Sequence, residues 1–448
     1  MLQYIKPITN LCFMFENINI WISGLIFLAT FWVMITETAH RAVIAFFGAI
    51  IMAIVGNSLG FYSYDLVLLS IDFNTILLLL GMMIIVAELE KTGVFQYLAI
   101  KTAKKTKGNM WYLIVALGAL TSILSMFLDN VTTIVLVVPV TLIMTKLLKI
   151  NPIPILMAEA LLSNIGGVAT LIGDPPNILI GSEAGFSFNM FLTHSFPVVL
   201  ISWISVLFLL RYYYKDELIQ PKKGLKSLMK MNEIKCIKDT LVLQRTVITL
   251  LCVIFLFFVH EFIELSAASV ALLGAATLLL WVSPHKDPKS IFKKVELSVL
   301  VFFVSLFILV GGIEHAGVLD TLVNLITQYA EKDILLTALA ILWGTAFLSA
   351  IIDNIPMTVA MLPVLAMLEA KGIPGVHILW WALVFGVGFG GNASPLGSTT
   401  GVIVVGKLES NKTPITTRQW IKVGLPATFI SLIIASIALI LFQDFFKY

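Results

Sequence analysis

The sequence predicts an all-α polytopic membrane protein that is built from two inverted-topology repeats. Of its 448 residues, 59% are apolar and only 12% are charged, whereas a soluble protein carries about twice that charged fraction. Apolar stretches close to the ~20 residues that cross a bilayer recur along the whole chain. Several polar motifs also recur at one fixed offset of 224 residues. These three observations together predict the fold class.

Apolar runs bounded by charged or turn-forming residues mark fourteen candidate spans. Two further segments, Val94–Lys105 and Val318–Ala330, are too short and too polar to cross, so we expect them to be helices at the membrane interface. The candidate spans are Ile20–Thr36, Ala42–Gly56, Phe73–Leu89, Met110–Leu128, Val131–Leu148, Pro154–Gly181, Phe191–Tyr212, Thr246–His260, Ser266–Val282, Glu296–Ile313, Ile334–Ile352, Ile355–Glu369, His377–Gly406 and Trp420–Phe442.

The basic residues are sorted by side. If the N-terminus lies outside, then Arg41, the segment 91–107, the long linker and the region 407–422 all fall on the inner side. This is the positive-inside pattern of a multi-pass protein. We therefore predict a cytoplasmic (inner) membrane protein with both termini outside and the linker inside. Of the 29 Lys and Arg residues, all fall inside except Lys6, Lys332, Lys371 and Lys447.

The repeat defines the domain organisation. Asp129-Asn130, followed by Pro139-Val140, recurs as Asp353-Asn354, followed by Pro363-Val364, and no gap is needed across the matched region. Each half has five spans, a re-entrant helical hairpin and an unwound helix, so the second half is inverted relative to the first. Inverted repeats are typical of alternating-access carriers, whose site lies between the halves near the midplane. The predicted boundaries are 1–213 for the first repeat (hairpin 110–148, unwound helix 154–181), 214–245 for the cytoplasmic linker, and 246–448 for the second repeat (hairpin 334–370, unwound helix 377–406).

Each hairpin has an Asp-Asn pair at its tip. A carboxylate deep in hydrocarbon costs about 3 kcal/mol even on the mildest scale, so it should face a partner or a cavity. We expect Asn130 and Asn354 to cap the helices that follow them. The first-turn residues of those helices would then direct free N–H groups at the site. The predicted contributors from the tips are Asp129, Asn130, Thr132, Thr133, Asp353, Asn354 and Thr358.

Each unwound helix is interrupted by glycines, prolines and polar residues. Irregular backbone at membrane depth survives only where it lines a cavity or packs within protein. Asp174, which precedes Pro175, is predicted to be a helix N-cap and, with Asp129 and Asp353, a site of proton or cation coupling. The predicted substrate-binding residues of the two interruptions are Gly166, Gly167, Thr170, Asn177, Gly391, Asn392, Ser394, Ser398 and Thr399.

These motifs carry a family resemblance. The runs Phe127–Thr133, Asn164–Asn177 and Ile352–Thr358 resemble the arsenite permease (ArsB), NhaD-type sodium–proton antiporter and P-protein group of the ion-transporter superfamily. The resemblance covers essentially the whole chain. It implies a scaffold domain, a transport domain that carries both hairpins, and an elevator-like movement. Members carry metalloid oxyacids, sodium ions or organic anions, so the resemblance leaves the substrate open.

The composition of the breaks guides the choice of substrate. No Lys or Arg lies in the four breaks, which disfavours a multivalent organic anion. Sodium would need oxygen ligands with at least one carboxylate, and the aspartates supply them. The second unwound segment has Ser398 where the first has Asp174, and this shortage of acids favours a neutral solute. We therefore predict an arsenical-resistance transporter that exports arsenite or antimonite, neutral trihydroxides, coupled to protons. Sodium–proton antiport is the alternative, and organic-anion carriage is less favoured.

The remaining expectations concern partners. The lipid bilayer, the small inorganic solute and protons or sodium are the expected partners. The superfamily is often dimeric, so a homodimer is one assembly to test, and docking of a cytosolic ATPase subunit on the linker stays open. The three scattered cysteines have no metal-ligand spacing. We expect no metal, no cofactor, no catalytic residue and no nucleic-acid partner, and therefore not an enzyme.

Overall fold

The structure is a computed structural model that describes residues 5–36, 38–218, 225–260, 262–282, 284 and 293–447, with side chains from residue 18 onward apart from Ser227. Within these residues the secondary structure is entirely helical, which confirms the predicted all-α polytopic class. Nine of the described helices are long and apolar enough to cross a membrane, and five apolar helices are shorter. The long ones are α1 (Ile5–Ile35), α2 (Arg41–Leu59), α4 (Phe73–Lys91), α6 (Met110–Leu128), α7 (Asn130–Leu148), α11 (Phe196–Tyr213, preceded by α10 Phe188–Met190 and the π-helical turn η1 Phe191–Ser195), α13 (Thr240–Val259), α16 (Leu297–His315) and α22 (Thr417–Leu441).

The shorter helices include both arms of the second hairpin and the first halves of both unwound helices. They are α8 (Ile153–Gly167), α14 (Ala267–Val282), α18 (Ile334–Ser349), α19 (Asn354–Ala370) and α20 (His377–Gly390). The remaining elements are α3 (Tyr64–Leu69), α5 (Val94–Lys105), α9 (Pro175–Glu183), η2 (Lys215–Glu217), α12 (Leu225–Lys230), η3 (Glu233–Cys236), α17 (Asp320–Ala330), α21 (Thr399–Ser410) and α23 (Gln443–Phe446).

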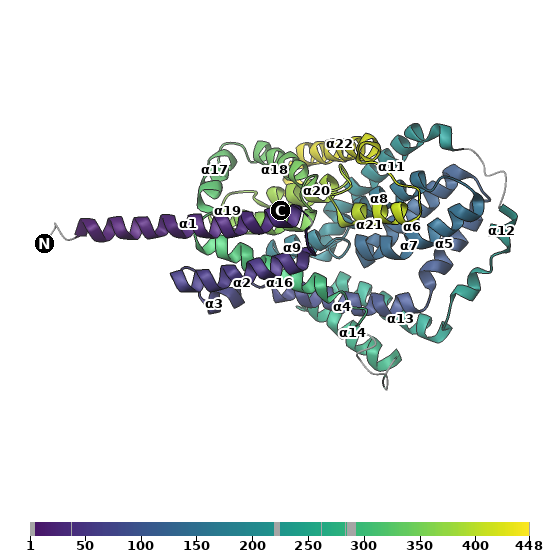
Figure 1. Cartoon of the computed structure of the whole chain (residues 1–448), viewed down its shortest axis with the longest axis horizontal. Helices are drawn as coiled ribbons and strands as arrows, with labels where there is room; N and C mark the ends of the chain where they lie inside the picture. The colour runs from purple at the N-terminus through teal and green to yellow at the C-terminus, as the bar shows by residue number, and fades with distance from the viewer. Residues whose placement is uncertain are drawn as a thin grey trace.

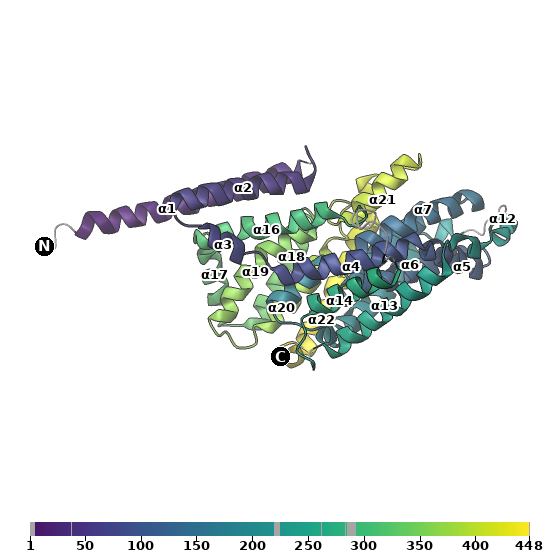
Figure 2. The same ribbon diagram turned by 90° about the horizontal axis from the view of Figure 1, so that it is seen from below.

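The helices form two packed groups. In the first, which we call the α2 group, α2 packs on α1 and α16, and α4 packs on α14, which in turn contacts α13. In the second, the hairpin group, α6 packs on α7 and α8, α18 packs on α20, and α22 contacts α11, α18 and α20. Figures 1 and 2 show the two groups side by side along the length of the molecule. Contacts of α16 with α19 and of α4 with α9 join them.

The two hairpins enter from opposite ends of the molecule. Helices α6 and α7 contact α5, and α7 also contacts α12, whereas α18 and α19 contact α17. Helices α5 and α12 lie at one end in Figure 1, and α17 lies at the other. The tips of both hairpins therefore meet in the middle.

At the α12 end the linker is held to α5 by an ion pair of 2.7 Å between Lys104 Nζ and Glu233 Oε2. The orientation of these ends across a membrane stays a prediction.

Equivalent hydrogen bonds recur at the 224-residue offset. Ser125 Oγ donates to the carbonyl of Ser163 at 2.8 Å, and Ser349 Oγ donates to the carbonyl of Val387 at 3.0 Å. Thr170 and Ser394 hold the two interruptions in the same manner: each hydroxyl donates to a carbonyl near the end of a hairpin arm, that of Met126 or Ala350. The polar residues that recur in the sequence thus recur in their contacts.

The predicted end of the linker, residue 245, does not coincide with the start of a helix. The first span of the second repeat, α13, begins at Thr240, so the helix takes in the last six residues of the predicted linker. Asp239 causes the early start, because its carboxylate accepts hydrogen bonds from the backbone N–H groups of Leu241 and Val242. Arg245 is accommodated at this end because its guanidinium donates to the carbonyl of Trp281 at 2.6 Å. Residues 219–224 of the linker and 285–292 lie outside the described part.

Candidate functional site

The hairpin tips are capped by their aspartates, not by their asparagines. Asp129 accepts hydrogen bonds from both the backbone N–H (2.8 Å) and the hydroxyl (2.7 Å) of Thr132. Asp353 accepts from the backbone N–H of Ile355 at 3.3 Å. The predicted capping role of Asn130 and Asn354 is therefore wrong. Each asparagine is instead the first residue of its helix, α7 or α19, and its side-chain amide donates to the buried carboxylate of Asp174.

The two asparagine amides converge on Asp174. Asn130 Nδ2 donates to Asp174 Oδ2 at 2.9 Å, and Asn354 Nδ2 donates to the same oxygen at 3.3 Å. Asp174 is only 2% exposed. It is the N-cap residue of α9, as predicted, with proline at the first helical position, but its side chain makes no capping hydrogen bond. The carboxylate turns away from α9 because the two amides supply better donors than a helix end that begins with prolines.

A second set of buried side chains extends this centre. Asn164 Nδ2 donates to Asn392 Oδ1 at 2.8 Å and to Ser398 Oγ at 2.9 Å, and its Oδ1 accepts from Thr400 at 2.7 Å. Asn130 Nδ2 also reaches Asn164 Oδ1 at 3.3 Å, which joins the two sets. We call the whole the central cluster. It consists of Asn130, Asn164, Asp174, Asn354, Asn392, Ser398 and Thr400, each no more than 5% exposed.

Several predicted site residues serve the packing around the cluster. Asn177 Nδ2 donates to the carbonyls of Gly167 and Thr170 at 3.0 and 2.8 Å, which closes the first interruption. Thr358 Oγ1 donates to the carbonyl of Asn354 within α19 at 2.8 Å. A Cβ on Gly391 would lie 2.8 Å from the carbonyl oxygen of Gly397. The backbone of Gly397 therefore occupies the space that a side chain at position 391 would need. Gly166 and Gly167 are close-packed in the same way, against Ser122 and Gly173.

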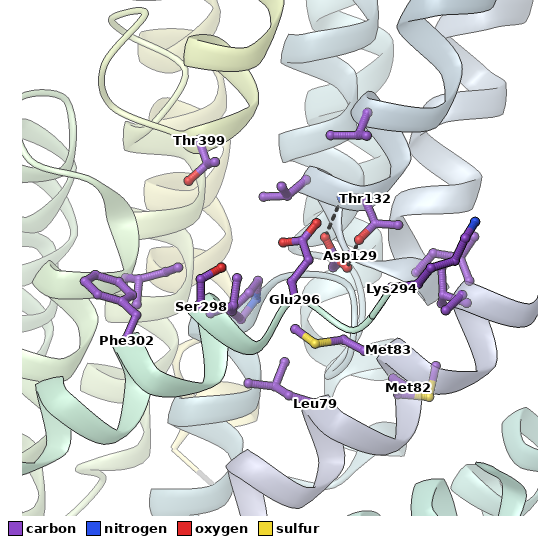
Figure 3. A pocket seen from close by; sticks show the side chains of 18 of the residues that line it. Leu79, Met82, Met83, Asp129, Thr132, Lys294, Glu296, Ser298, Phe302 and Thr399 are labelled. Carbon is purple, nitrogen blue, oxygen red and sulfur yellow. Dashed lines mark hydrogen bonds between the residues drawn. The ribbon is translucent and has the colours of Figure 1, made fainter. Parts of the chain in front are cut away.

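A cavity of about 330 Å³ lies beside the cluster, between the α2 group and the hairpin group. Asp129 and Thr132 line it from the first hairpin, and Thr399 lines it from α21. Glu296, which precedes α16, reaches toward Asp129 across the cavity (Figure 3). Lys294 Nζ is paired with Glu90 Oε2 at 3.1 Å. Among the described residues, Asp129 and Glu296 have no ion-pair partner, so the cavity has an excess of negative charge.

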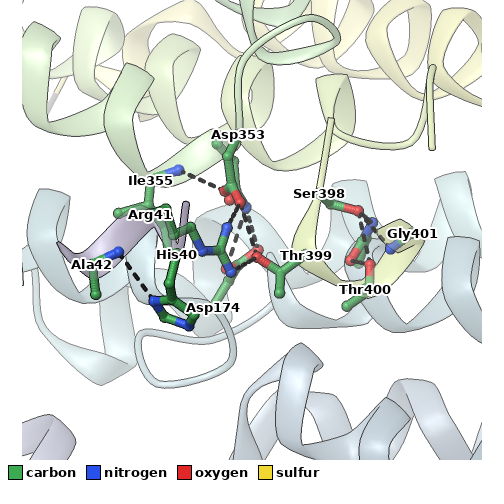
Figure 4. Close-up of polar contacts among 12 residues, drawn as sticks. His40, Arg41, Ala42, Asp174, Asp353, Ile355, Ser398, Thr399, Thr400 and Gly401 are labelled. Atoms are coloured by element: carbon green, nitrogen blue, oxygen red, sulfur yellow. Dashed lines mark hydrogen bonds and ion pairs between the residues drawn. The ribbon is translucent and has the colours of Figure 1, made fainter. Parts of the chain in front are cut away.

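The second tip is neutralised by an arginine. Arg41, the first residue of α2, forms an ion pair with Asp353 and donates from Nη2 to Thr399 Oγ1 at 2.8 Å (Figure 4). Thr399 Oγ1 also donates to Asp353 Oδ2 at 2.9 Å. The sequence prediction placed Arg41 at the inner surface and found no basic residue in the four breaks. The fold brings this guanidinium to the second tip, so the breaks do not lack a cation.

The structure therefore divides the predicted residues. It gathers Asn130, Asp174, Asn354, Asn392 and Ser398 in the central cluster. It sets Asp129, Thr132, Thr399 and Asp353 around the cavity and its arginine. Thr133 is buried next to the cluster on α7, and its hydroxyl has no hydrogen-bond partner. The residues that the prediction of the site omits are Asn164, Thr400, Arg41, Glu296 and Lys294; Asn164 and Thr400 could have been found, since both lie within the polar runs of the two interruptions.

Comparisons with known proteins show the family of the chain. The sequence pattern of the citrate transporter family, CitMHS, matches residues 30–386. The chain belongs to this family. It is 37% identical over 419 residues to the 46 kDa membrane protein of Mycobacterium leprae, across 92% of this chain and 96% of that protein. It is 36% identical over the same length to an uncharacterized transporter of Mycobacterium tuberculosis. It is 30% identical over 480 residues to the human P protein, across 89% of this chain and 57% of that protein.

Membership of the CitMHS family makes the chain a membrane transporter of the ion-transporter superfamily. The resemblance to the P-protein group that the sequence motifs indicated is confirmed. The family match includes both hairpins and the first interruption but ends within α20. The second interruption, with Asn392 and Ser398, lies beyond it. The central cluster of this CitMHS chain therefore has to be interpreted from its own contacts.

Proposed function

We propose that the chain is a cation-coupled secondary transporter, and that exchange of sodium for protons is the activity its site supports best. The observation that carries the proposal is Asp174, a buried carboxylate held between the tip asparagines of both halves. Among the described residues it has no cationic partner. A buried carboxylate without a counter-charge is costly unless it binds a proton or a cation.

The oxygens around Asp174 suit a hard cation. Sodium, like other hard cations, prefers carboxylate, amide and hydroxyl oxygens. Three buried oxygens on the first turns of α7 and α9 have no hydrogen-bond partner, and they belong to Asn130 (Oδ1), Thr133 and Asn177 (Oδ1). Unpartnered buried acceptors are rare in folded proteins. A cation at this place would satisfy them and neutralise Asp174.

The cavity supports the same conclusion. Arg41 and Lys294 are each paired with an acid, which leaves the carboxylates of Asp129 and Glu296 in excess. Negative potential in a low-dielectric cleft raises the local concentration of cations. An entering sodium ion would therefore meet two carboxylates in the cavity before it reaches the central cluster.

Transport of an organic anion is the second candidate. The guanidinium of Arg41 lines the cavity, so the argument from the lack of basic residues no longer holds, and the family is described as citrate transporters. The cavity is also much larger than one metalloid trihydroxide. Arsenite efflux, our prediction from the sequence, ranks third. The prediction of arsenite efflux relied on a shortage of charged side chains in the breaks, whereas the fold adds Arg41 and Glu296 to the site.

The proposal is tested with the purified full chain in liposomes. Each vesicle holds a pH-sensitive dye, and sodium, citrate or arsenite is added outside. We expect sodium to change the internal pH, and we expect Asp174→Asn to abolish that change. Citrate or arsenite uptake without any sodium-driven proton flux would contradict the proposal. Vesicles with Asp444→Asn, a change of an exposed acid at the end of the chain, serve as the matched control.

A further inference from the structure

The acids at the two hairpin tips have unlike surroundings, although they are equivalent in the repeat. Asp129 accepts hydrogen bonds from Thr132 of its own helix only, and no cationic side chain contacts it among the described residues. Asp353 contacts Arg41 of the α2 group and Thr399 of α21. The position 224 residues after Arg41 is Leu265. The repeat therefore supplies an arginine to one tip and not to the other.

The contacts of Arg41 fix its guanidinium at the second tip. One nitrogen pairs with Asp353, and another donates to Thr399 at 2.8 Å. The ring of Phe302 on α16 lies under the guanidinium, 5.7 Å from its centre. A guanidinium keeps its charge at every physiological pH and offers a planar fork of donors. Neither a change of pH nor a small rotation would remove this positive charge.

We infer that Arg41 is a resident cation that occupies the place of a second transported cation at Asp353, and so limits the number of sodium ions that the chain binds. This inference rests on the proposed cation-coupled function. A carboxylate that is already paired with a guanidinium gains little free energy from binding a sodium ion. A sodium ion on the same carboxylate would lie close to the guanidinium, and the two positive charges would repel each other. Asp129, Glu296 and Asp174 remain available to a cation, and Asp353 does not.

Arg41 therefore sets the ion stoichiometry, and it is not only a basic residue that orients the chain in the membrane. Arg41 begins α2, whereas Asp353 and Thr399 belong to the hairpin group. Release of Asp353 therefore requires the second tip to separate from α2. Removal of the positive charge at position 41 should expose a second cation site without any movement of the hairpin.

The experiment measures how much radioactive sodium the purified full chain binds at saturation. We expect Arg41→Gln to bind one additional sodium ion per chain, and Arg41→Lys, which keeps the charge, to bind the wild-type number. The double variant Arg41→Gln/Asp353→Asn should return to the wild-type number, because the exposed carboxylate is gone. Arg245→Gln is the matched control. Arg245 also lies over an aromatic ring, it donates to a backbone carbonyl, and it contacts no acid within the described part of the chain.

The outcomes separate this inference from the proposed function. If the wild-type chain binds no sodium, the proposed function fails and the inference fails with it. If the wild type binds sodium and Arg41→Gln binds the same number or fewer, only the inference is overturned. Asp353→Asn alone gives a second test that does not depend on the folding of Arg41→Gln. It should leave the number of bound sodium ions unchanged, and a loss of one ion would show that Asp353 is a ligand in the wild type.

Discussion

Asn130 and Asn354, which stand 224 residues apart, both donate a hydrogen bond to the same oxygen of Asp174. Each asparagine belongs to the tip of a different hairpin, and Asp174 belongs to the interruption of the first half only. The second half has Ser398 at the equivalent position, and Ser398 bonds to Asn164 instead. A repeat with equivalent tips thus encloses a single carboxylate, and the centre of the molecule is asymmetric.

The first prediction concerns this carboxylate. Asp174→Asn should abolish sodium-dependent transport, because an amide carries no negative charge to neutralise a bound cation. Its carbonyl oxygen can still accept the hydrogen bonds of Asn130 and Asn354, since both donate to a single oxygen of Asp174. The thermal unfolding temperature of the detergent-solubilised variant should therefore stay close to that of the wild type. Transport near that of the wild type would mean that the charge of Asp174 is not needed.

The second prediction concerns Glu296. Glu296→Gln should raise the sodium concentration at half-maximal transport by about tenfold, the effect of roughly 1.4 kcal/mol, because the cavity loses one of its two uncompensated carboxylates. Glu90→Gln is the matched control, since Glu90 lines the same cavity but is paired with Lys294. The measurement is the sodium dependence of the initial rate in liposomes. Equal effects of the two variants would indicate a general response to charge.

The third prediction concerns the backbone of the second interruption. Gly391→Ala should strongly reduce both folding yield and transport, because the new Cβ would lie 2.8 Å from the carbonyl oxygen of Gly397. Gly406→Ala is the control. Gly406 lies in α21 with nothing within 4 Å of such a Cβ, and alanine stabilises a helix by about 0.5–1 kcal/mol relative to glycine. The amount of folded protein is compared by fluorescence-detected size-exclusion chromatography. A normal yield for Gly391→Ala would show that the backbone segments of Gly391 and Gly397 can move apart to make room for the methyl group.

The fourth prediction concerns the linker and pH. The hydrogen bond from Lys104 lowers the pKa of Glu233 below its ordinary value. A lowered pKa in the docked state means that docking is favoured while Glu233 is ionised and is lost as the pH falls through that lowered value. The protection of residues 225–238 against hydrogen exchange, corrected for the intrinsic pH dependence of amide exchange, should therefore decrease in acid. Glu233→Gln should show low protection at every pH, and a pH-dependent protection that persists in this variant would assign the effect to another group.

The sequence by itself determined the helical membrane class, the family and the positions of the four breaks. Apolar length and charge sorting depend only on local composition, so most predicted spans match helices, and the span Met110–Leu128 matches α6 residue for residue. The repeat and the breaks also located five of the seven residues of the central cluster, all but Asn164 and Thr400. These features could be predicted because the cost of a polar group in hydrocarbon acts on each segment separately.

Only the tertiary structure decided which side chains meet. Charge sorting gave Arg41 an inner-surface position and the Asp-Pro pattern placed Asp174 at a helix N-cap, but neither named a side-chain partner. The fold sets Arg41 against Asp353 and turns the carboxylate of Asp174 toward two asparagines. Both contacts have the same physical cause. A charged group takes the best-oriented partner in space, and the partner of Arg41 lies 312 residues away in the chain. A segment read alone cannot reveal a partner that only the packing of two helix groups brings within reach.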